Sequence, residues 1–118
     1  MGDEYFLNMG VKISQDNNIS HAVINGDIDH HTAYNLRETI DNYIKLYTPQ
    51  ILKLDFSEVQ FMDSSGIGLI MGRFKLIKSL GGNLKVINIP KNLERMMKLA
   101  GLEKLGIFES EDKISCKN

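Results

Sequence analysis

The junction between a buried strand and a helix constrains this chain more than any other feature of its sequence. Residues 51–56 form a short apolar run that is typical of a buried strand. From Ser64 onward, apolar side chains recur at helical spacing, namely Ile67, Ile70, Met71, Phe74 and Ile77. Asp63, Ser64 and Ser65 are therefore expected at a helix N-terminus, where free N–H groups and the helix dipole favour negative charge. A phosphoryl group on serine would be tolerated there.

The remainder of the chain alternates strands and helices around this junction. The expected strands cover residues 9–13, 19–24, 51–56 and 84–89, with a short edge strand at 107–108. The expected helices cover about 32–47, 64–80 and 93–100, and they end before Pro49, Gly81 and Gly101. This alternation favours parallel strands joined by right-handed crossovers. The predicted fold class is therefore α/β, with helices packed on a small mixed sheet.

Ser64 and Ser65 allow a structural and a functional interpretation. Asp and Ser are the preferred N-caps of any helix, so these residues could serve as caps alone. Gly66 and Gly68 follow, however, and each glycine costs up to about 1 kcal/mol in a helix relative to alanine. Such glycines would leave the backbone bare for the close approach of another protein. This segment by itself leaves both interpretations open.

Known phosphate-binding and catalytic motifs do not fit this segment. Residues 66–72 lack the lysine and hydroxyl of a Walker loop, and their glycines miss the dinucleotide-binding spacing by one residue. A nucleophile elbow needs glycine two residues before the serine, where this chain has Met62. A hydrolase that combines Ser64, a loop histidine and Asp29 is the enzymatic alternative. A serine beside Asp63 at a helix start is, however, better suited to be modified by another enzyme than to act as a nucleophile. We expect a protein that is not an enzyme and has no cofactor.

A second polar cluster, Asp27-Ile28-Asp29-His30-His31, contains groups that bind metals in other proteins. A structural metal site needs about four well-placed ligands, and the only other histidine, His21, falls on an expected strand. We therefore expect no metal site. Asp29 or Thr32 is instead expected to cap the first helix, with the histidines exposed beside it.

The composition is that of one small domain, residues 1–118, in a reducing compartment. A hydrophobic content of 42% is sufficient for one core. The one cysteine, Cys116, cannot form an internal disulfide and falls in a short polar tail at about 109–118. No apolar run approaches the roughly 18 residues of a membrane span, and the N-terminus does not resemble a signal peptide. We expect a cytoplasmic protein, monomeric when free, with no membrane partner.

Charge is distributed unevenly along the chain. Residues 1–63 carry a net charge of −6, whereas residues 64–108 carry +6. Such asymmetry can mark a nucleic-acid-binding face. Here the basic residues are scattered, and Phe74 and Phe108 are the only aromatic residues of the basic half. Both halves must also interleave in one sheet, so no nucleic-acid partner is expected.

Two segments of the sequence resemble a known family. Phe61-Met62-Asp63-Ser64-Ser65-Gly66-Ile67-Gly68, followed by Gly72-Arg73 and Gly81-Gly82, closely resembles the STAS domain of anti-sigma factor antagonists. Gly26-Asp27-Ile28-Asp29-His30-His31-Thr32-Ala33 resembles the sporulation type more narrowly. The resemblance runs from about Val11 to Phe108 and implies the same α/β layout. It also implies a C-terminal helix, for which the tail of this chain is short and polar.

The resemblance implies a regulator of transcription that works by partner switching. The unmodified protein would bind a nucleotide-loaded anti-sigma factor that is also a serine kinase, and so free the sigma factor. The kinase would phosphorylate Ser64, which follows Asp63 as the family's acceptor does, and a serine phosphatase would reset the switch. The implied contact surface comprises Asp29, His30, His31, Thr32, Met62, Asp63, Ser65, Gly66, Ile67 and Gly68. The alternative is a STAS scaffold or stress-signalling component that binds another regulator.

Overall fold

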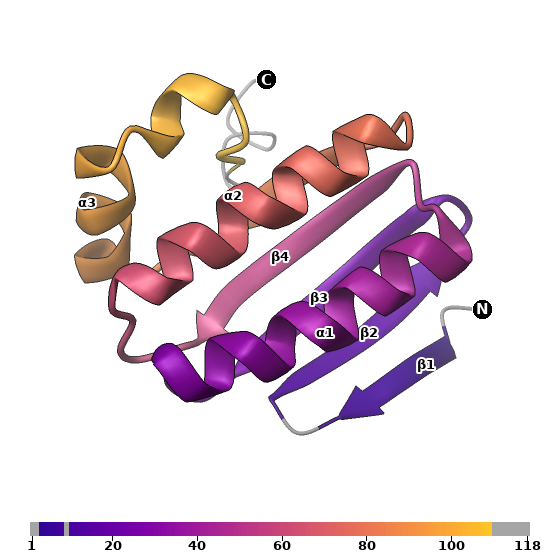
Figure 1. Ribbon diagram of the computed structural model, residues 1–118, viewed down its shortest axis with the longest axis horizontal. Helices are drawn as coiled ribbons and strands as arrows, with labels where there is room; N and C mark the ends of the chain where they lie inside the picture. Colours follow the sequence, from indigo (N-terminus) through magenta and orange to yellow (C-terminus); the bar gives the residue numbers. More distant parts are fainter. Residues whose placement is uncertain (1–2, 9, 110–118) are drawn as a thin grey trace, which may run out of the picture.

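The computed structural model describes residues 3–8 and 10–109, and Figure 1 shows how its helices lie across a sheet. The strands are β1 (Asp3–Asn8), β2 (Val11–Asp16), β3 (Ile19–Asn25), β4 (Ile51–Glu58) and β5 (Asn83–Ile87). The helices are α1 (His30–Tyr47), α2 (Ser64–Ser79), α3 (Lys91–Leu99) and the short 3₁₀ helix η1 (Leu102–Leu105). Most of the predicted polar tail, including Cys116, lies outside the described residues.

The sheet is mixed, as predicted. Over the described residues its strand order is β1-β2-β3-β4-β5, so every strand pairs with its neighbour in the chain. The β1–β2 and β2–β3 pairs are antiparallel, whereas β3–β4 and β4–β5 are parallel. Helices α1 and α2 supply the two crossovers that parallel pairing requires. This arrangement confirms the α/β fold class.

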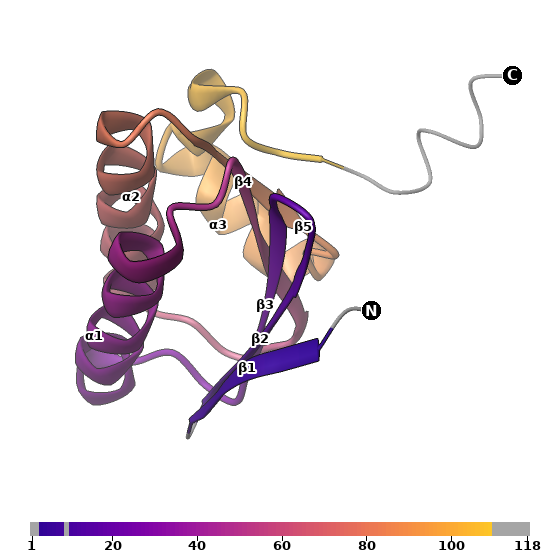
Figure 2. The ribbon, with the colours of Figure 1, turned by 90° about the vertical axis from the view of Figure 1, so that its right-hand side faces the viewer.

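Helices α1 and α2 cover one face of the sheet, and α3 lies beyond α2 at the β5 side (Figures 1 and 2). Alternate residues of the central strands point toward α1 and α2, as the period of a strand requires. The buried set includes Ala22, Ile24, Leu52, Leu54 and Phe56 from the strands and Leu36, Ile40, Ile44, Ile70 and Ile77 from the helices. None of the described helices is both long and apolar enough to span a membrane.

Three departures from the sequence-based expectation occur in the sheet. Strand β1 was not predicted, because its sequence lacks regular alternation; it pairs with β2 with a register shift between Glu4 and Phe6. The first predicted strand begins later than expected, at Val11, because Gly10 turns the chain with a φ of 93°. The predicted edge strand at 107–108 is a single bridge between Val86 and Phe108.

A cluster of hydrogen-bonded polar side chains lies on the sheet face that points away from α1 and α2. The buried carboxylate of Asp55 on β4 accepts hydrogen bonds from the Ser57 N–H at 2.8 Å and from Asn88 Nδ2 at 3.1 Å. It also lies 2.8 Å from Nε2 of the half-exposed His21 on β3. Burial raises the pKa of Asp55, but the hydrogen bonds outweigh burial and hold it below its ordinary value of 3.8.

Candidate functional site

The segments 26–33 and 61–68, which carry the family resemblance, lie together because backbone hydrogen bonds join the loops that follow β3 and β4. These strands are parallel neighbours, so both loops leave the same edge of the sheet. Ile28 and Met62 form a parallel bridge there: the Ile28 N–H donates to the Phe61 carbonyl at 2.9 Å, and the Asp63 N–H donates to the Ile28 carbonyl at 3.1 Å. The next residue along each loop, Asp29 or Asp63, is the N-cap of a helix. The N-termini of α1 and α2 therefore lie at the same end of the sheet (Figure 1).

Helix α1 begins with a complete capping box. Asp29 Oδ1 accepts the N–H groups of His31 at 2.9 Å and Thr32 at 3.0 Å, and Thr32 Oγ1 accepts the Asp29 N–H at 2.8 Å. Asp29 and Thr32 thus cap together, and the helix starts at His30, two residues before the expected start. The hydrogen bond from the Thr32 N–H, followed by that from His31, lowers the pKa of the Asp29 carboxyl below 3.8.

Helix α2 is capped by Asp63 rather than by a serine. Asp63 Oδ1 accepts the Ser65 N–H at 2.8 Å, and the Asp63 carbonyl accepts the Gly66 N–H at 2.9 Å. Ser64 is the first residue of the helix and is exposed. Among the described residues its hydroxyl has no hydrogen-bond partner, so Ser64 is not needed as a cap. The position combines an accessible hydroxyl with the positive end of a helix.

Met62 and Gly66 lie beneath this surface rather than on it. Met62 is only 3% exposed, and Gly66 is buried against it. A Cβ at position 66 would overlap Cγ and Sδ of Met62. The interpretation of Gly66 as room for a partner is therefore wrong, because the packing of Met62 requires this glycine. At Gly68, by contrast, a Cβ would have no neighbour within 4 Å.

The two histidines of the first loop are exposed at the start of α1. Their rings meet edge to face, with centroids 6.1 Å apart. Within the described part of the chain, no three His, Cys, Asp or Glu side chains are grouped closely enough to hold a metal ion. The hydrolase alternative needs a hydrogen bond between Ser64 and a histidine, and none is present over these same residues.

A groove of about 740 Å³ runs between α1 and α2 from this end of the molecule. Its α1 side is formed by His30, His31, Ala33, Tyr34, Asn35 and Arg37, and its α2 side by Ser65, Gly68, Leu69, Gly72 and Arg73. Tyr34, Asn35 and Arg37 were not predicted from the sequence as site residues. Tyr34 and Arg37 follow His30 at steps of four and three residues, and Asn35 follows His31 at a step of four, which is the signal that could have found them.

A buried ion pair holds the two walls of the groove together. Arg73 of α2 is buried, and its Nε lies 2.7 Å from Oδ1 of Asp41 on α1. Arg73 Nη1 also donates to the Leu69 carbonyl at 3.2 Å. Burial lowers the pKa of Arg73, and the Asp41 carboxylate opposes this by favouring the charged form. The positive charge of Arg73 is thus neutralised by Asp41.

Comparisons with known proteins identify one family and several similar anti-sigma factor antagonists. The STAS-domain family profile matches residues 11–114. The anti-sigma F factor antagonist of Paenibacillus polymyxa is 31% identical over 106 residues, which cover 89% of this chain and 91% of that protein. The anti-sigma-B factor antagonist of Bacillus subtilis is 33% identical over 97 residues, covering 82% of this chain and 87% of the relative.

Solved structures with the same fold include both forms of one such antagonist. The unphosphorylated anti-sigma factor antagonist SpoIIAA superposes with a TM-score of 0.75 at 21% identity, over 88% of this chain and 91% of that one. The phosphorylated form of the Bacillus cell fate determinant SpoIIAA gives a TM-score of 0.69 at 21% identity, over 91% and 97% of the two chains. At this identity the superpositions show a shared fold.

Proposed function

This chain belongs to the STAS-domain family, and we propose that it acts as an anti-sigma factor antagonist that phosphorylation of Ser64 switches off. The assignment of Ser64 as the phosphorylated residue rests on one observation. Ser64 is exposed at the first position of α2, while the neighbouring Asp63 performs the capping that a serine would otherwise provide. Its hydroxyl can therefore accept a phosphoryl group without loss of a structural hydrogen bond.

The proposed cycle has two partners besides the sigma factor. The unmodified protein binds a nucleotide-loaded anti-sigma factor and so releases the sigma factor. The anti-sigma factor is also a serine kinase that transfers phosphate to Ser64, and a serine phosphatase removes it. The chain itself has no catalytic role in this cycle. The names of its curated relatives and the fold it shares with SpoIIAA support this proposal.

The surface that contacts the partner surrounds Ser64 in this proposal. Its outer members are Asp29, His30, His31, Thr32, Asp63, Ser65, Ile67 and Gly68. The bridge between Ile28 and Met62 supports this assignment, since it brings the starts of α1 and α2 together. Met62 and Gly66 belong to the same site as the packed layer that holds the α2 N-terminus in place.

A binding and transcription experiment tests the proposed function. The purified chain is titrated into the purified anti-sigma factor of the same organism, loaded with ADP, and then into the complex of that factor with its sigma factor. We expect direct binding and recovery of sigma-dependent transcription. Incubation with ATP should then abolish both effects together with the appearance of phosphoserine. An absence of binding to the anti-sigma factor, combined with stable binding to another regulatory protein, would instead favour the scaffold alternative.

A further inference from the structure

The groove between α1 and α2 continues from the Ser64 surface along both helices. It begins at residues assigned above to partner contact, His30, His31 and Ser65, and extends to Arg37 and Gly72. We propose that this groove is a docking site for a carboxylate-bearing polypeptide segment of the anti-sigma factor. The inference rests on the proposed function, because it names the chemistry by which that same partner is recognised beyond the phosphorylation site.

The charge of the α1 wall determines the chemistry of the occupant. The Arg37 guanidinium lies over the Tyr34 ring, 5.1 Å from its centroid, and Tyr34 is 58% exposed. None of the residues lining the groove is acidic. Asp41, which lies close by on α1, is already paired with Arg73. A planar guanidinium held by an aromatic ring is well suited to bind a carboxylate in bidentate geometry.

The α2 wall leaves room for close approach of a polypeptide backbone. Gly68 and Gly72 both lie inside the helix, where glycine disfavours folding relative to alanine. A Cβ at either position would meet nothing within 4 Å, and neither residue has a positive φ. The fold of this chain thus gives no steric or conformational reason for these two glycines, unlike Gly66. An external occupant that packs on the bare helix surface provides such a reason.

The shape of the groove favours a segment of chain over a small ligand. Gly68 and Gly72 are one helical turn apart, about 6 Å along the axis, and both lie beyond Ser65 on the same wall. The basic group stands on the opposite wall, on α1. A helix or extended segment laid along the groove can place small side chains on the glycines and a carboxylate on Arg37 at the same time.

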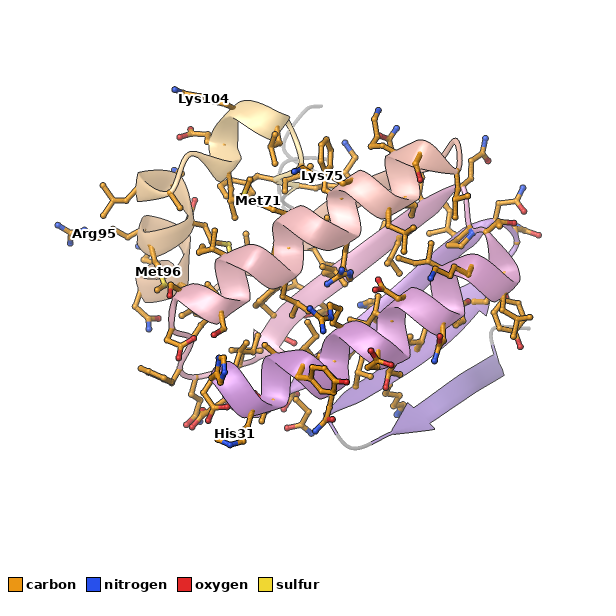
Figure 3. All side chains as sticks on the ribbon, viewed as in Figure 1. His31, Met71, Lys75, Arg95, Met96 and Lys104 are labelled. Carbon is orange, nitrogen blue, oxygen red and sulfur yellow. The ribbon has the colours of Figure 1, made fainter. Side chains whose placement is uncertain are left out.

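Charge reversal at Arg37 tests the docking site directly. Arg37→Glu should weaken binding of the purified, ADP-loaded anti-sigma factor about tenfold or more in a calorimetric titration, as expected for a charged anchor residue. The matched control is Lys75→Glu, which makes the same charge change on the side of α2 that faces away from α1 and the groove (Figure 3). The control should bind within about twofold of the wild type.

Filling the groove provides a second, independent test. Gly72→Leu should weaken binding by a similar factor while the melting temperature stays within a few degrees of that of the wild type, since a Cβ there meets no atom within 4 Å. Wild-type affinity in both Arg37→Glu and Gly72→Leu would overturn the docking site and leave the proposed function standing. Weakening by Lys75→Glu alone would overturn the docking site and place the partner on the opposite side of α2. If the wild type itself does not bind the anti-sigma factor, the proposed function fails first.

Inorganic phosphate and ATP serve as probes for the competing small-ligand occupant. Neither should bind the isolated wild-type chain in a manner that depends on Arg37. Saturable ATP binding that Arg37→Glu abolishes and that leaves affinity for the anti-sigma factor unchanged would overturn the proposal and assign the groove to a nucleotide.

Discussion

Met62 fills the space that a side chain at position 66 would need. The methionine comes from the loop after β4, and the glycine comes from the first turn of α2. Because a Cβ on residue 66 would overlap Cγ and Sδ of Met62, the two residues fix how closely the helix approaches the loop. The same loop is bonded to Ile28, so this contact also sets the position of Ser64 relative to the start of α1.

Gly66→Ala should therefore destabilise the protein despite the higher helix propensity of alanine. Met62 is almost fully buried and must change rotamer or move the helix, and overpacking of this kind costs about 1–3 kcal/mol. Chemical denaturation measures the loss in free energy of unfolding. In a Met62→Ala background, Gly66→Ala should cost less than it does in the wild type, because the side chain that it overlaps is gone. A Gly66→Ala protein as stable as the wild type would show that Met62 does not constrain this position.

Gly68→Ala should have the opposite effect on stability. Its Cβ meets no neighbour, so the free energy of unfolding should stay unchanged or rise by up to about 1 kcal/mol. Binding to the anti-sigma factor should weaken, because the methyl group intrudes on the proposed contact surface. Thermal denaturation and calorimetry on one sample separate the two effects. Unchanged affinity would remove Gly68 from that surface.

The phosphate acceptor can be assigned by paired serine variants. Ser64→Ala should receive no phosphate from the kinase but should still bind it, whereas Ser65→Ala should remain a substrate. Since Asp63 is the cap, Ser64→Ala should change stability by only a few tenths of a kcal/mol, whereas Asp63→Ala should cost about 1 kcal/mol. Phosphopeptide mass spectrometry of the wild type provides the check, and phosphate located on Ser65 would contradict the assignment.

The sequence alone predicted the features that depend on local pattern. Helical spacing after Ser64 placed the start of α2 correctly, and the cap of α1 was expected at Asp29 or Thr32, which form a capping box together. Pro49 and Gly81 similarly limited the two central helices. Propensity, capping and turn chemistry act over a few residues, so they can be read from one chain.

Features that depend on distant contacts could not be predicted in this way. The role of Gly66 depends on where the Met62 side chain packs, and the groove depends on the pairing of α1 with α2 through Arg73 and Asp41. Strand β1 depends on its pairing with β2, because its own sequence lacks regular alternation. Capping by Asp63 was also not separable from capping by serine, since both residue types favour that position.

Stability at acid pH should depend on Asp55. Its pKa is lowered in the folded protein, so its contribution is fully present above the ordinary value of 3.8 and is lost as the pH falls through the lowered folded value. In Asp55→Asn this part of the acid sensitivity should disappear. Denaturant midpoints measured from about pH 7 to about pH 2 should therefore decline less steeply for the variant than for the wild type. Parallel curves would show that Asp55 does not contribute.

Phosphorylation of Ser64 should release the partner without unfolding the protein. A phosphoryl group adds about −1.5 to −2 charges, and at the first residue of α2 it meets free N–H groups and the positive end of the helix. The fold should therefore be unaffected or slightly stabilised. The added bulk and charge would instead exclude the close contact at Gly68 and repel the phosphate-bearing nucleotide of the kinase.

Ser64→Asp separates these two mechanisms because it adds negative charge without a kinase. Its circular dichroism spectrum should match that of the wild type and its melting temperature should lie within a few degrees, whereas its affinity for the nucleotide-loaded anti-sigma factor should fall about tenfold or more. Ser64→Asn is the matched control of similar size without charge, and it should lose less affinity than Ser64→Asp. Hydrogen exchange on the phosphorylated wild type completes the test. Loss of amide protection across β3 and β4 would show that phosphate acts by changing the conformation of the core, and the interface mechanism would then be wrong.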